Sequence, residues 1–306
     1  MKILNIGSLN IDDVYQLPHF PRPGETLHAT ACKRYPGGKG LNQSIALARA
    51  GASVIHAGAI GADGVFLRDL LKSEKVNTGP LILHPAEPTG HAVILVMPNG
   101  ENTILLHPGA NFTLAPEHFK KFIKPLHAGD ALLLQNEISN LYHILHLAHE
   151  AKLRVILNPA PFTAELHRAP LHLLDTLIVN EIEACQLVEI PVGSAPRDAF
   201  AALQKKFPET TLILTLGPDG VMATMPHQSY PVLEIPAFRV PSVVDTTAAG
   251  DTFTGYYLAE RLRAAPFPDA LRFACAAAAL CCTQPGAAPS IPRRAQVEAM
   301  IKFGVR

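Results

Sequence analysis

The sequence predicts a three-layer α/β/α fold with a mostly parallel central sheet and a small second β-sheet. From residue 130 onward, short apolar strands alternate with helical segments, and strands connected in this way form a parallel sheet covered on both faces. Before residue 110, Asn99-Gly100 separates two β-rich runs, 91–97 and 102–106, which predicts a hairpin. This antiparallel insertion in an otherwise alternating chain indicates the second sheet.

The 306 residues are enough for a large core, either as one α/β domain or as a domain plus a small appendage. The apolar fraction is 48% and the charged fraction is 17%, proportions typical of a chain with a packed core. Lys plus Arg and Asp plus Glu both number 26, so the formal net charge is zero. Because a balanced charge offers no electrostatic footprint, we expect no nucleic-acid partner and no membrane partner.

The five cysteines show no Cys-x-x-Cys spacing, which argues against a zinc site. An odd number of scattered cysteines indicates free thiols in a reducing compartment. The N-terminus reaches polar residues too early for a signal peptide, and the apolar run 273–282 is too short to span a bilayer. We therefore expect a cytoplasmic protein.

The first strand, residues 2–6, leads into Gly7-Ser8-Leu9-Asn10-Ile11-Asp12. Side chains just past strand ends in open α/β sheets line ligand crevices, so Asn10 and Asp12 are candidate binding residues. Several prolines then predict irregular or edge-strand structure over 13–35. The predicted hairpin can pair with these edges.

A glycine loop follows, Pro36-Gly37-Gly38-Lys39-Gly40, and a helix is expected over 44–51. Lys39 precedes Gly40 rather than Ser or Thr, so this is not a Walker loop, and the dinucleotide Gly-x-Gly-x-x-Gly pattern is also missing. The glycines let a ligand approach the backbone, and Asn42 offers both a donor and an acceptor. Helix entry without a function is the alternative interpretation.

Regular βα alternation then places polar residues at strand ends. The expected strands are 131–135, 154–157, 177–179 and 211–215. Ligands of such folds bind at the carboxyl ends of the strands. The polar residues at those ends, which are candidate ligand contacts, are Asn136, Glu137, Asn158, Asn180, Glu183 and Thr215.

The stretch 244–253 is a turn of small residues that ends in Gly250 and Asp251 and leads into an expected helix over 253–262. Small residues let backbone N–H groups approach a ligand, and a helix start adds unpaired donors and a positive dipole end. The turn therefore predicts a phosphate site. Beside it, the Asp251 carboxylate suits a general base that accepts the proton of an attacking hydroxyl. A turn that only caps a helix is the simpler alternative.

Two motifs, 37–42 and 245–251, stand in this order along the chain. Together they resemble the two signatures of the ribokinase family of sugar kinases, the phosphofructokinase-B type, and the resemblance covers essentially the whole chain. Further matching segments are 7–12, 20–26, 107–111, 157–161, 180–183, 215–217 and 286–290. The resemblance implies a ribokinase-like fold over residues 1–306, with a lid formed by about 13–35 and 89–107 and a homodimer through that lid.

The same resemblance implies an ATP-dependent kinase of the primary hydroxyl of a pentose, most simply D-ribose, with Mg²⁺ and a K⁺ activator. The expected catalytic residues are the base Asp251 and an anion hole of Ala248, Ala249 and Gly250. The expected sugar contacts are Asn10, Asp12, Gly38, Lys39, Asn42 and Glu137. The expected contacts to ATP and its Mg²⁺ are Asn180, Glu183, Thr215, Gly217, Gly220 and Cys275. The expected K⁺ loop positions are Asp245, Thr247, Cys281, Gln284, Gly286 and Ser290.

Three residues depart from the family pattern: Leu41 and Asn136, which bear on the choice of sugar, and Cys275, which bears on the nucleotide. The alternatives within enzymes are a kinase for another furanose, such as deoxyribose or a ketohexose, or for a nucleoside. A non-catalytic sugar-binding protein on this fold is a further alternative, against which the intact Asp251 argues. A nicotinamide-dependent oxidoreductase is disfavoured by the missing dinucleotide fingerprint.

Overall fold

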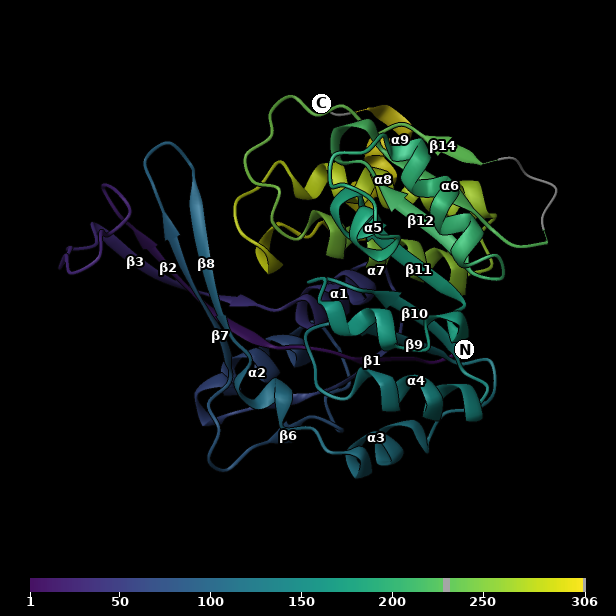
Figure 1. The fold of residues 1–306 in the computed structure, drawn as a ribbon, viewed down its shortest axis with the longest axis horizontal. Coiled ribbons are helices and arrows are strands. Elements are labelled where there is room, and N and C mark those ends of the chain that lie inside the picture. The colour runs from purple at the N-terminus through teal and green to yellow at the C-terminus, as the bar shows by residue number, and fades with distance from the viewer. Residues whose placement is uncertain (228–231, 305–306) are drawn as a thin grey trace.

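The central element of the fold is an eight-stranded sheet (Figure 1). The computed structural model describes residues 1–227 and 232–304. In spatial order the strands are β14 (Leu233–Ile235), β13 (Val221–Thr224), β12 (Thr211–Thr215), β11 (Thr176–Asn180), β10 (Arg154–Asn158), β9 (Ala131–Gln135), β1 (Ile3–Ile6) and β4 (Val54–Ala57). Only the β12–β13 and β13–β14 pairs are antiparallel, so the prediction of a mostly parallel sheet is confirmed.

Helices cover both faces of this sheet, which gives the predicted three layers. The helices that contribute to the apolar cluster on one face are α1 (Lys39–Arg49), α2 (Val65–Ser73), α7 (Ala249–Leu262), α8 (Phe267–Cys281) and α9 (Arg294–Phe303). Those of the other face are α3 (Pro116–Ile123), α4 (Leu141–Glu150), α5 (Glu181–Leu187) and α6 (Pro196–Lys206). Short 3₁₀ turns lie at Ala62–Gly64, Gly109–Phe112, Ala164–Arg168, Leu171–Leu173, Gly217–Asp219 and Ala288–Ser290. Within the described residues, no helix has the length and apolarity needed to cross a membrane.

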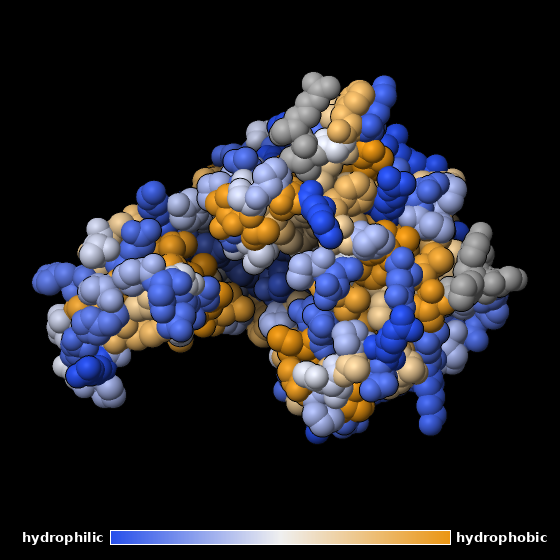
Figure 2. Space-filling view, turned by 90° about the horizontal axis from the view of Figure 1, so that it is seen from above, coloured by the Kyte–Doolittle hydropathy of each residue, from blue (hydrophilic) through white to orange (hydrophobic). Residues whose placement is uncertain are grey.

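A second sheet of four strands projects from this body (Figure 1). Its order is β3 (Ala31–Gly37), β2 (Asn10–Gln16), β7 (Gly90–Val96) and β8 (Asn102–His107), and the predicted hairpin is the β7–β8 pair. β7 pairs with β2, so the predicted pairing of the hairpin with the early edge strands is confirmed. A two-stranded sheet, β5 (Ala59–Ile60) with β6 (Ile82–Leu83), completes the strands. Figure 2 shows a recess where the projecting sheet meets the body.

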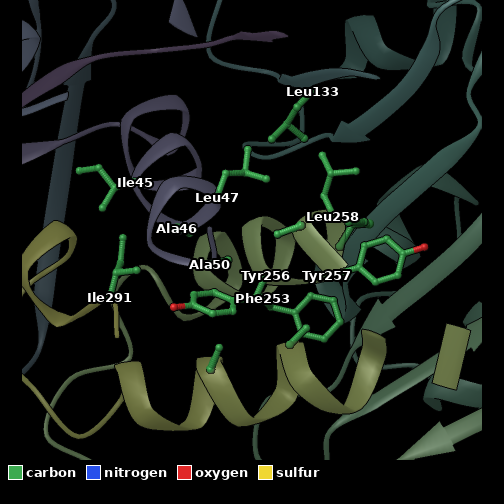
Figure 3. Packing of buried hydrophobic residues seen from close by; sticks show 14 of the residues in the cluster. Ile45, Ala46, Leu47, Ala50, Leu133, Phe253, Tyr256, Tyr257, Leu258 and Ile291 are labelled. Carbon is green, nitrogen blue, oxygen red and sulfur yellow. The ribbon is translucent and has the colours of Figure 1, made fainter. Parts of the chain in front are cut away.

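The close crossing of α1 and α7 determines which residues meet in the site. Gly255 of α7 lies against α1, where an added Cβ would be 2.5 Å from the Ala46 Cβ. Figure 3 shows Ala46 and Leu47 of α1 beside Phe253 and Tyr256 of α7 within the apolar cluster. Because a side chain at position 255 would separate the helices, this glycine lets the first turns of α1 and α7 approach each other.

Several element boundaries differ from the sequence-based expectation, and α7 for example begins at Ala249 rather than at residue 253. α1 begins at Lys39 rather than at residue 44, because Gly38 adopts a φ of 95° and the Asn42 N–H already donates to the Gly38 carbonyl at 3.0 Å. The loop glycines therefore start the helix instead of preceding it. Asn10 and Asp12 do not follow the central strand directly, since they belong to β2, at the foot of the projecting sheet.

Candidate active site

Asp251 lies in the first turn of α7 and is held by two amides of α1. Asn42 Nδ2 donates to Asp251 Oδ2 at 3.0 Å, and Gln43 Nε2 donates to Asp251 Oδ1 at 2.8 Å. Only 7% of the Asp251 surface is exposed. One N–H on each carboxylate oxygen fixes the plane of the carboxylate, and each oxygen retains acceptor capacity for a further proton donor.

The turn before α7 presents free backbone donors, as its small residues predict. Ala248 adopts a left-handed conformation with φ 62°, and Thr252 N–H donates to its carbonyl at 2.8 Å. Among the described residues, the N–H groups of Ala248 and Gly250 have no acceptor within hydrogen-bond distance. The Ala249 N–H, the third expected donor, is directed to the Thr246 carbonyl at 3.2 Å. The start of α7 therefore offers at least two N–H groups to an anion.

The glycine loop packs directly on the backbone that follows β1. An added Cβ at Gly40 would lie 2.4 Å from the Ser8 nitrogen, and one at Gly38 would lie 2.9 Å from the Asn10 nitrogen. The Leu41 N–H donates to the Ser8 carbonyl at 2.9 Å. This contact brings the early candidate Asn10 next to the loop that carries Lys39, and only glycine permits it.

Lys39 is surrounded by carboxylates. Glu137 Oε2 accepts the Lys39 backbone N–H at 3.0 Å and also accepts the Ser8 hydroxyl in a short hydrogen bond. Burial lowers the pKa of the Lys39 ammonium, but the charges of Asp251, Glu137 and Glu183 outweigh it and raise that pKa overall. The site thus holds one cation among three acidic side chains, which come from α7, the end of β9 and α5.

The surroundings of Asp12 disfavour the charged form of its carboxylate. Burial, the Glu137 charge and the Asp13 charge raise the pKa of Asp12 to about 7. On β3, Tyr35 is the register partner of Asp12, and Gly37 lies two residues further on, where an added Cβ would be 2.0 Å from the Asp12 carboxylate. In the part of the chain that the structure describes, Asp12 forms no ion pair, and an acceptor-only group of this kind suits a ligand that brings hydroxyl donors.

This environment predicts a pH dependence. We expect kcat/KM for the sugar to fall as pH decreases through about 7, because Asp12 becomes protonated below its raised pKa and loses acceptor capacity. Asp12→Asn does not titrate, so its kcat/KM is expected to be lower and its profile flatter. At each pH, the kcat/KM of the wild type is divided by that of Asp12→Asn, both measured at saturating ATP. Effects of pH on the nucleotide and on the assay are the same for both enzymes and cancel in this ratio. A ratio that stays constant on both sides of pH 7 would contradict the assignment.

The predicted nucleotide side is built around the start of α5. Asn180 and Glu183 form a reciprocal capping box: Glu183 N–H donates to Asn180 Oδ1 at 2.8 Å, and Asn180 N–H donates to Glu183 Oε2 at 3.0 Å. Burial raises the pKa of Glu183, against the hydrogen bond from Asn180 and the Lys39 charge. Gly220, with φ 101°, packs on the end of β14, where an added Cβ would lie 2.1 Å from the Ile235 carbonyl oxygen.

The predicted cation loops meet at Asp245. Its Oδ1 accepts the Thr247 N–H at 2.9 Å, and its Oδ2 accepts the Gly286 N–H at 2.8 Å. Burial raises the pKa of Asp245, but the hydrogen bond from the Thr247 hydroxyl, together with these two N–H bonds, lowers that pKa overall. At the end of α8, Cys281 Sγ lies 3.0 Å from Ser290 Oγ and 3.6 Å from the Thr247 carbonyl oxygen. Asp245 therefore ties the turn before α7 to the loop after α8.

The three departures from the family pattern have packing or hydrogen-bond partners within the protein. Leu41 is completely buried in the apolar cluster around α1. Asn136 Nδ2 donates to the Pro161 carbonyl at 2.7 Å and to Thr163 Oγ1 at 3.2 Å, which ties it to the loop after β10. Cys275 is buried in α8, and burial raises the pKa of its thiol to about 12. Its expected contact with the nucleotide stays a prediction.

Sequence reasoning missed several residues that hold the site together. Ser8 supports Glu137, and Asn111 Nδ2 donates to Asn10 Oδ1 at 2.8 Å. Gln43 contacts Asp251 and also lies 3.3 Å from Asn158 Oδ1. The position of Gln43, directly after Asn42 near the start of α1, was the signal that a second amide reaches the same carboxylate.

The family model described as pfkB family carbohydrate kinase matches residues 1–294. The ribokinase of Haemophilus influenzae is 37% identical over 295 residues, with 94% of each chain covered. The deoxyribokinase of Salmonella typhimurium is 31% identical over 300 residues, covering 95% of this chain and 96% of the relative.

Solved structures agree with this result. The Cryptococcus neoformans ribokinase in complex with ADP has a TM-score of 0.83 and 35% identity, and 97% of this chain and 98% of that chain are covered. The Arabidopsis thaliana ribokinase complexed with ribose and ATP has a TM-score of 0.86 and 28% identity over 99% of both chains. The chain therefore belongs to the pfkB family of carbohydrate kinases, and it is a phosphotransferase with an alcohol group as acceptor.

Proposed function

We propose that this chain transfers the γ-phosphoryl group of ATP to the primary hydroxyl of D-ribose and forms D-ribose 5-phosphate. The observation that carries the proposal is Asn42, whose Nδ2 donates to Asp251 while its buried Oδ1 has no hydrogen-bond partner among the described residues. A buried acceptor beside a carboxylate suits a ligand rich in hydroxyl donors. The similarity to ribokinases, one of them solved with ribose and ATP, supports ribose as that ligand.

The sugar would lie in the recess between the foot of the projecting sheet and the first turns of α1 and α7. Its proposed contacts are Asn10, Asp12, Gly38, Lys39, Asn42 and Glu137. Asp12 and Glu137 accept hydroxyl protons, while Lys39 donates. Acceptors outnumber donors in this set, which matches a polyol.

The proposed reaction needs one base and a site for charge. Asp251 accepts the proton of the primary hydroxyl as that oxygen forms a bond to the γ-phosphorus, and the bond from this phosphorus to the β–γ bridging oxygen breaks, which releases ADP. The free N–H groups of Ala248 and Gly250 and the positive end of α7 stabilise the charge on the transferring group. Lys39 adds a positive charge on the sugar side.

The oxygens of the α5 cap suit Mg²⁺ through water. Asn180 and Glu183 use their side-chain oxygens in the reciprocal capping box, so they would hold Mg²⁺ and the phosphates by way of water molecules. In the described part of the chain, no cluster of three His, Cys, Asp or Glu side chains could ligate a metal directly. When bound, Mg²⁺ would neutralise charge on the phosphates. Thr215, Gly217, Gly220 and Cys275 are the proposed nucleotide contacts.

We further propose K⁺ as an activator, held by loop oxygens of Asp245, Thr247, Cys281, Gln284, Gly286 and Ser290. Asp245 already joins the two loops and is ionised at neutral pH, and carbonyl and hydroxyl oxygens of the kind gathered here suit a monovalent cation. The bound ion would order the turn that presents Ala248 and Gly250. We expect a several-fold rise in kcat when KCl replaces tetramethylammonium chloride at equal ionic strength, with little change in KM.

A second readout does not depend on activity. Because an ion that binds only the folded state stabilises it by mass action, the melting temperature should also rise in KCl. Asp245→Asn keeps the shape but removes the charge, and we expect it to weaken both effects. Equal rates and equal melting temperatures in the two salts would reject the cation site.

The projecting sheet is the proposed lid over the sugar and the proposed dimer contact. Ile104, Leu105 and Leu106 of β8 are 57%, 62% and 46% exposed, and an edge strand with exposed apolar side chains favours a partner. We expect light scattering to give twice the mass of one chain, and Ile104→Glu to give the single-chain mass. If the wild type has the mass of one chain at assay concentrations, the proposed dimer is wrong, while the proposed lid role of the sheet is unaffected.

A deoxyribose kinase is the second candidate, because a deoxyribokinase is among the relatives. An assay of ADP release across ribose, 2-deoxyribose, ketohexoses and nucleosides tests the proposed function directly. The highest kcat/KM is expected for ribose, and no ADP release with any sugar would indicate a non-catalytic binding protein.

The five free thiols support the cytoplasm as the location.

A further inference from the structure

A chain of hydrogen-bonded polar side chains leads from Asp251 into the interior of the protein. Its members are Asp251, Gln43, Gln135, Asn5, Ser44 and His56. Gln43, Gln135, Asn5, Ser44 and His56 are completely buried. Asn5 and His56 pair in register on β1 and β4, on the face of the sheet that otherwise packs apolar residues against α1. We call this set the buried amide chain.

The backbone carbonyl of Gly40 determines the direction of the buried amide chain. A carbonyl only accepts, so Asn5 Nδ2 faces it at 2.8 Å, and Asn5 Oδ1 faces Gln135. Gln135 Nε2 then donates to Asn5 Oδ1 at 3.0 Å and to Gln43 Oε1 at 2.7 Å. Because its oxygen is used in this way, Gln43 directs its Nε2 to Asp251. Each amide therefore has one orientation.

Ser44 and His56 complete the far end of the chain. Asn5 Nδ2 also donates to Ser44 Oγ at 2.8 Å, so the Ser44 hydroxyl proton is directed to His56 Nδ1, 2.8 Å away. Burial lowers the pKa of His56 to about 4, although the Gly7 carbonyl opposes this shift in part. At neutral pH the ring is uncharged and Nδ1 is an acceptor. The far end is thus a neutral group with one tautomer.

The central amide leaves one atom unpaired. Gln135 Oε1 is buried and has no hydrogen-bond partner among the described residues. It faces Gly7, where an added Cβ would lie only 2.3 Å from this oxygen. Apolar side chains at these strand positions would avoid the unfavourable burial of an unpaired acceptor. Stability alone therefore does not explain the buried amide chain.

We propose that Gln135 and Asn5 are positioning residues for Asp251, an inference that rests on the base role proposed above. They hold the Gln43 N–H toward one carboxylate oxygen, while Asn42 holds the other. The plane of the carboxylate is thereby fixed relative to α1, and so is the direction from which it takes the proton. Without Gln135, the Gln43 amide is free to turn its oxygen toward Asp251, and the two oxygens repel each other.

Gln135→Met tests the proposal with little change in side-chain volume. We expect kcat to fall roughly tenfold or more, toward the roughly 100-fold that a 1 Å misplacement can cause, while KM for ribose and for ATP stay within about threefold. Tyr256→Phe is the matched control, because it also removes a buried hydrogen bond, from Tyr256 to the Pro292 carbonyl at 2.6 Å, on the same helix as Asp251. This control should lose stability and keep kcat.

The same substitution in an Asp251→Asn background separates the positioning role from the base role. If Gln135 acts through Asp251, Gln135→Met has no further effect on the residual turnover there. Equal losses in both backgrounds, or a folded Gln135→Met enzyme with wild-type kcat, would overturn the positioning role. Near-normal turnover of Asp251→Asn would refute the base role itself. If Gln135→Met does not fold, Asn5→Leu is measured by the same criteria.

Discussion

Asp251→Asn is expected to lower kcat by roughly 100- to 10,000-fold, the range typical for loss of a general base. The fold should tolerate the change. Asn42 Oδ1 has no partner, so the Asn42 amide can turn and accept the new N–H group, while Gln43 continues to donate to the remaining oxygen. The substitution replaces one oxygen of Asp251, so the sugar loses one hydrogen-bond acceptor. We therefore expect a higher KM for ribose and an unchanged KM for ATP.

The measurement compares kcat, both KM values and the melting temperature of the wild type and the variant. Asp269→Asn is the matched control, because Asp269 is also an acidic residue in the first turn of a helix, α8, but lies outside the site. It should retain wild-type turnover. An Asp251→Asn enzyme that melts like the wild type and turns over at a comparable rate would show that Asp251 is not the base.

The parts of the site that follow from backbone requirements were predictable from sequence. The glycine-rich run 37–40 and the small-residue run 248–250 predict close approach of the backbone to a neighbour or a ligand, and both are helix starts in the structure. The predicted contacts Asn42 and Asp251, more than 200 residues apart, do meet, in a direct hydrogen bond. Their meeting depends on the α1–α7 crossing at Gly255, which no local pattern around either residue reveals.

The supporting residues were not predictable for a different reason. Asn5, His56 and Gln135 occupy buried strand positions where the period of the pattern calls for apolar side chains, and a single polar residue in such a run has no local signature. Their role depends on pairing across β4, β1 and β9, which is a property of the sheet order. Leu41 is the opposite case. Its place beside the glycine loop indicated a role in the choice of sugar, but its side chain is buried in the apolar core.

Ribose is expected to exceed 2-deoxyribose in kcat/KM, by up to about 10,000-fold if the site hydrogen-bonds the missing hydroxyl. Asp12 carries this expectation. Asp12 is partly buried, forms no ion pair within the described residues and has a pKa raised to about 7, so a hydroxyl that donates to its carboxylate offsets the lost hydration. A sugar without that hydroxyl leaves the acceptor unpaired, at a cost of about 1–3 kcal/mol or more.

Asp12→Ala should therefore lower kcat/KM for ribose much more than for 2-deoxyribose, and so reduce the ratio between them. Asp13→Ala is the matched control, because the adjacent residue on β2 points to the opposite face and pairs with Arg34 at 2.8 Å. It should leave the ratio unchanged. Leu41 is buried in the apolar cluster and Asn136 donates to the Pro161 carbonyl, so we expect neither to set the preference between the two sugars. A ratio that favours deoxyribose, or one that survives Asp12→Ala, would reject ribose recognition by Asp12 and leave the kinase assignment intact.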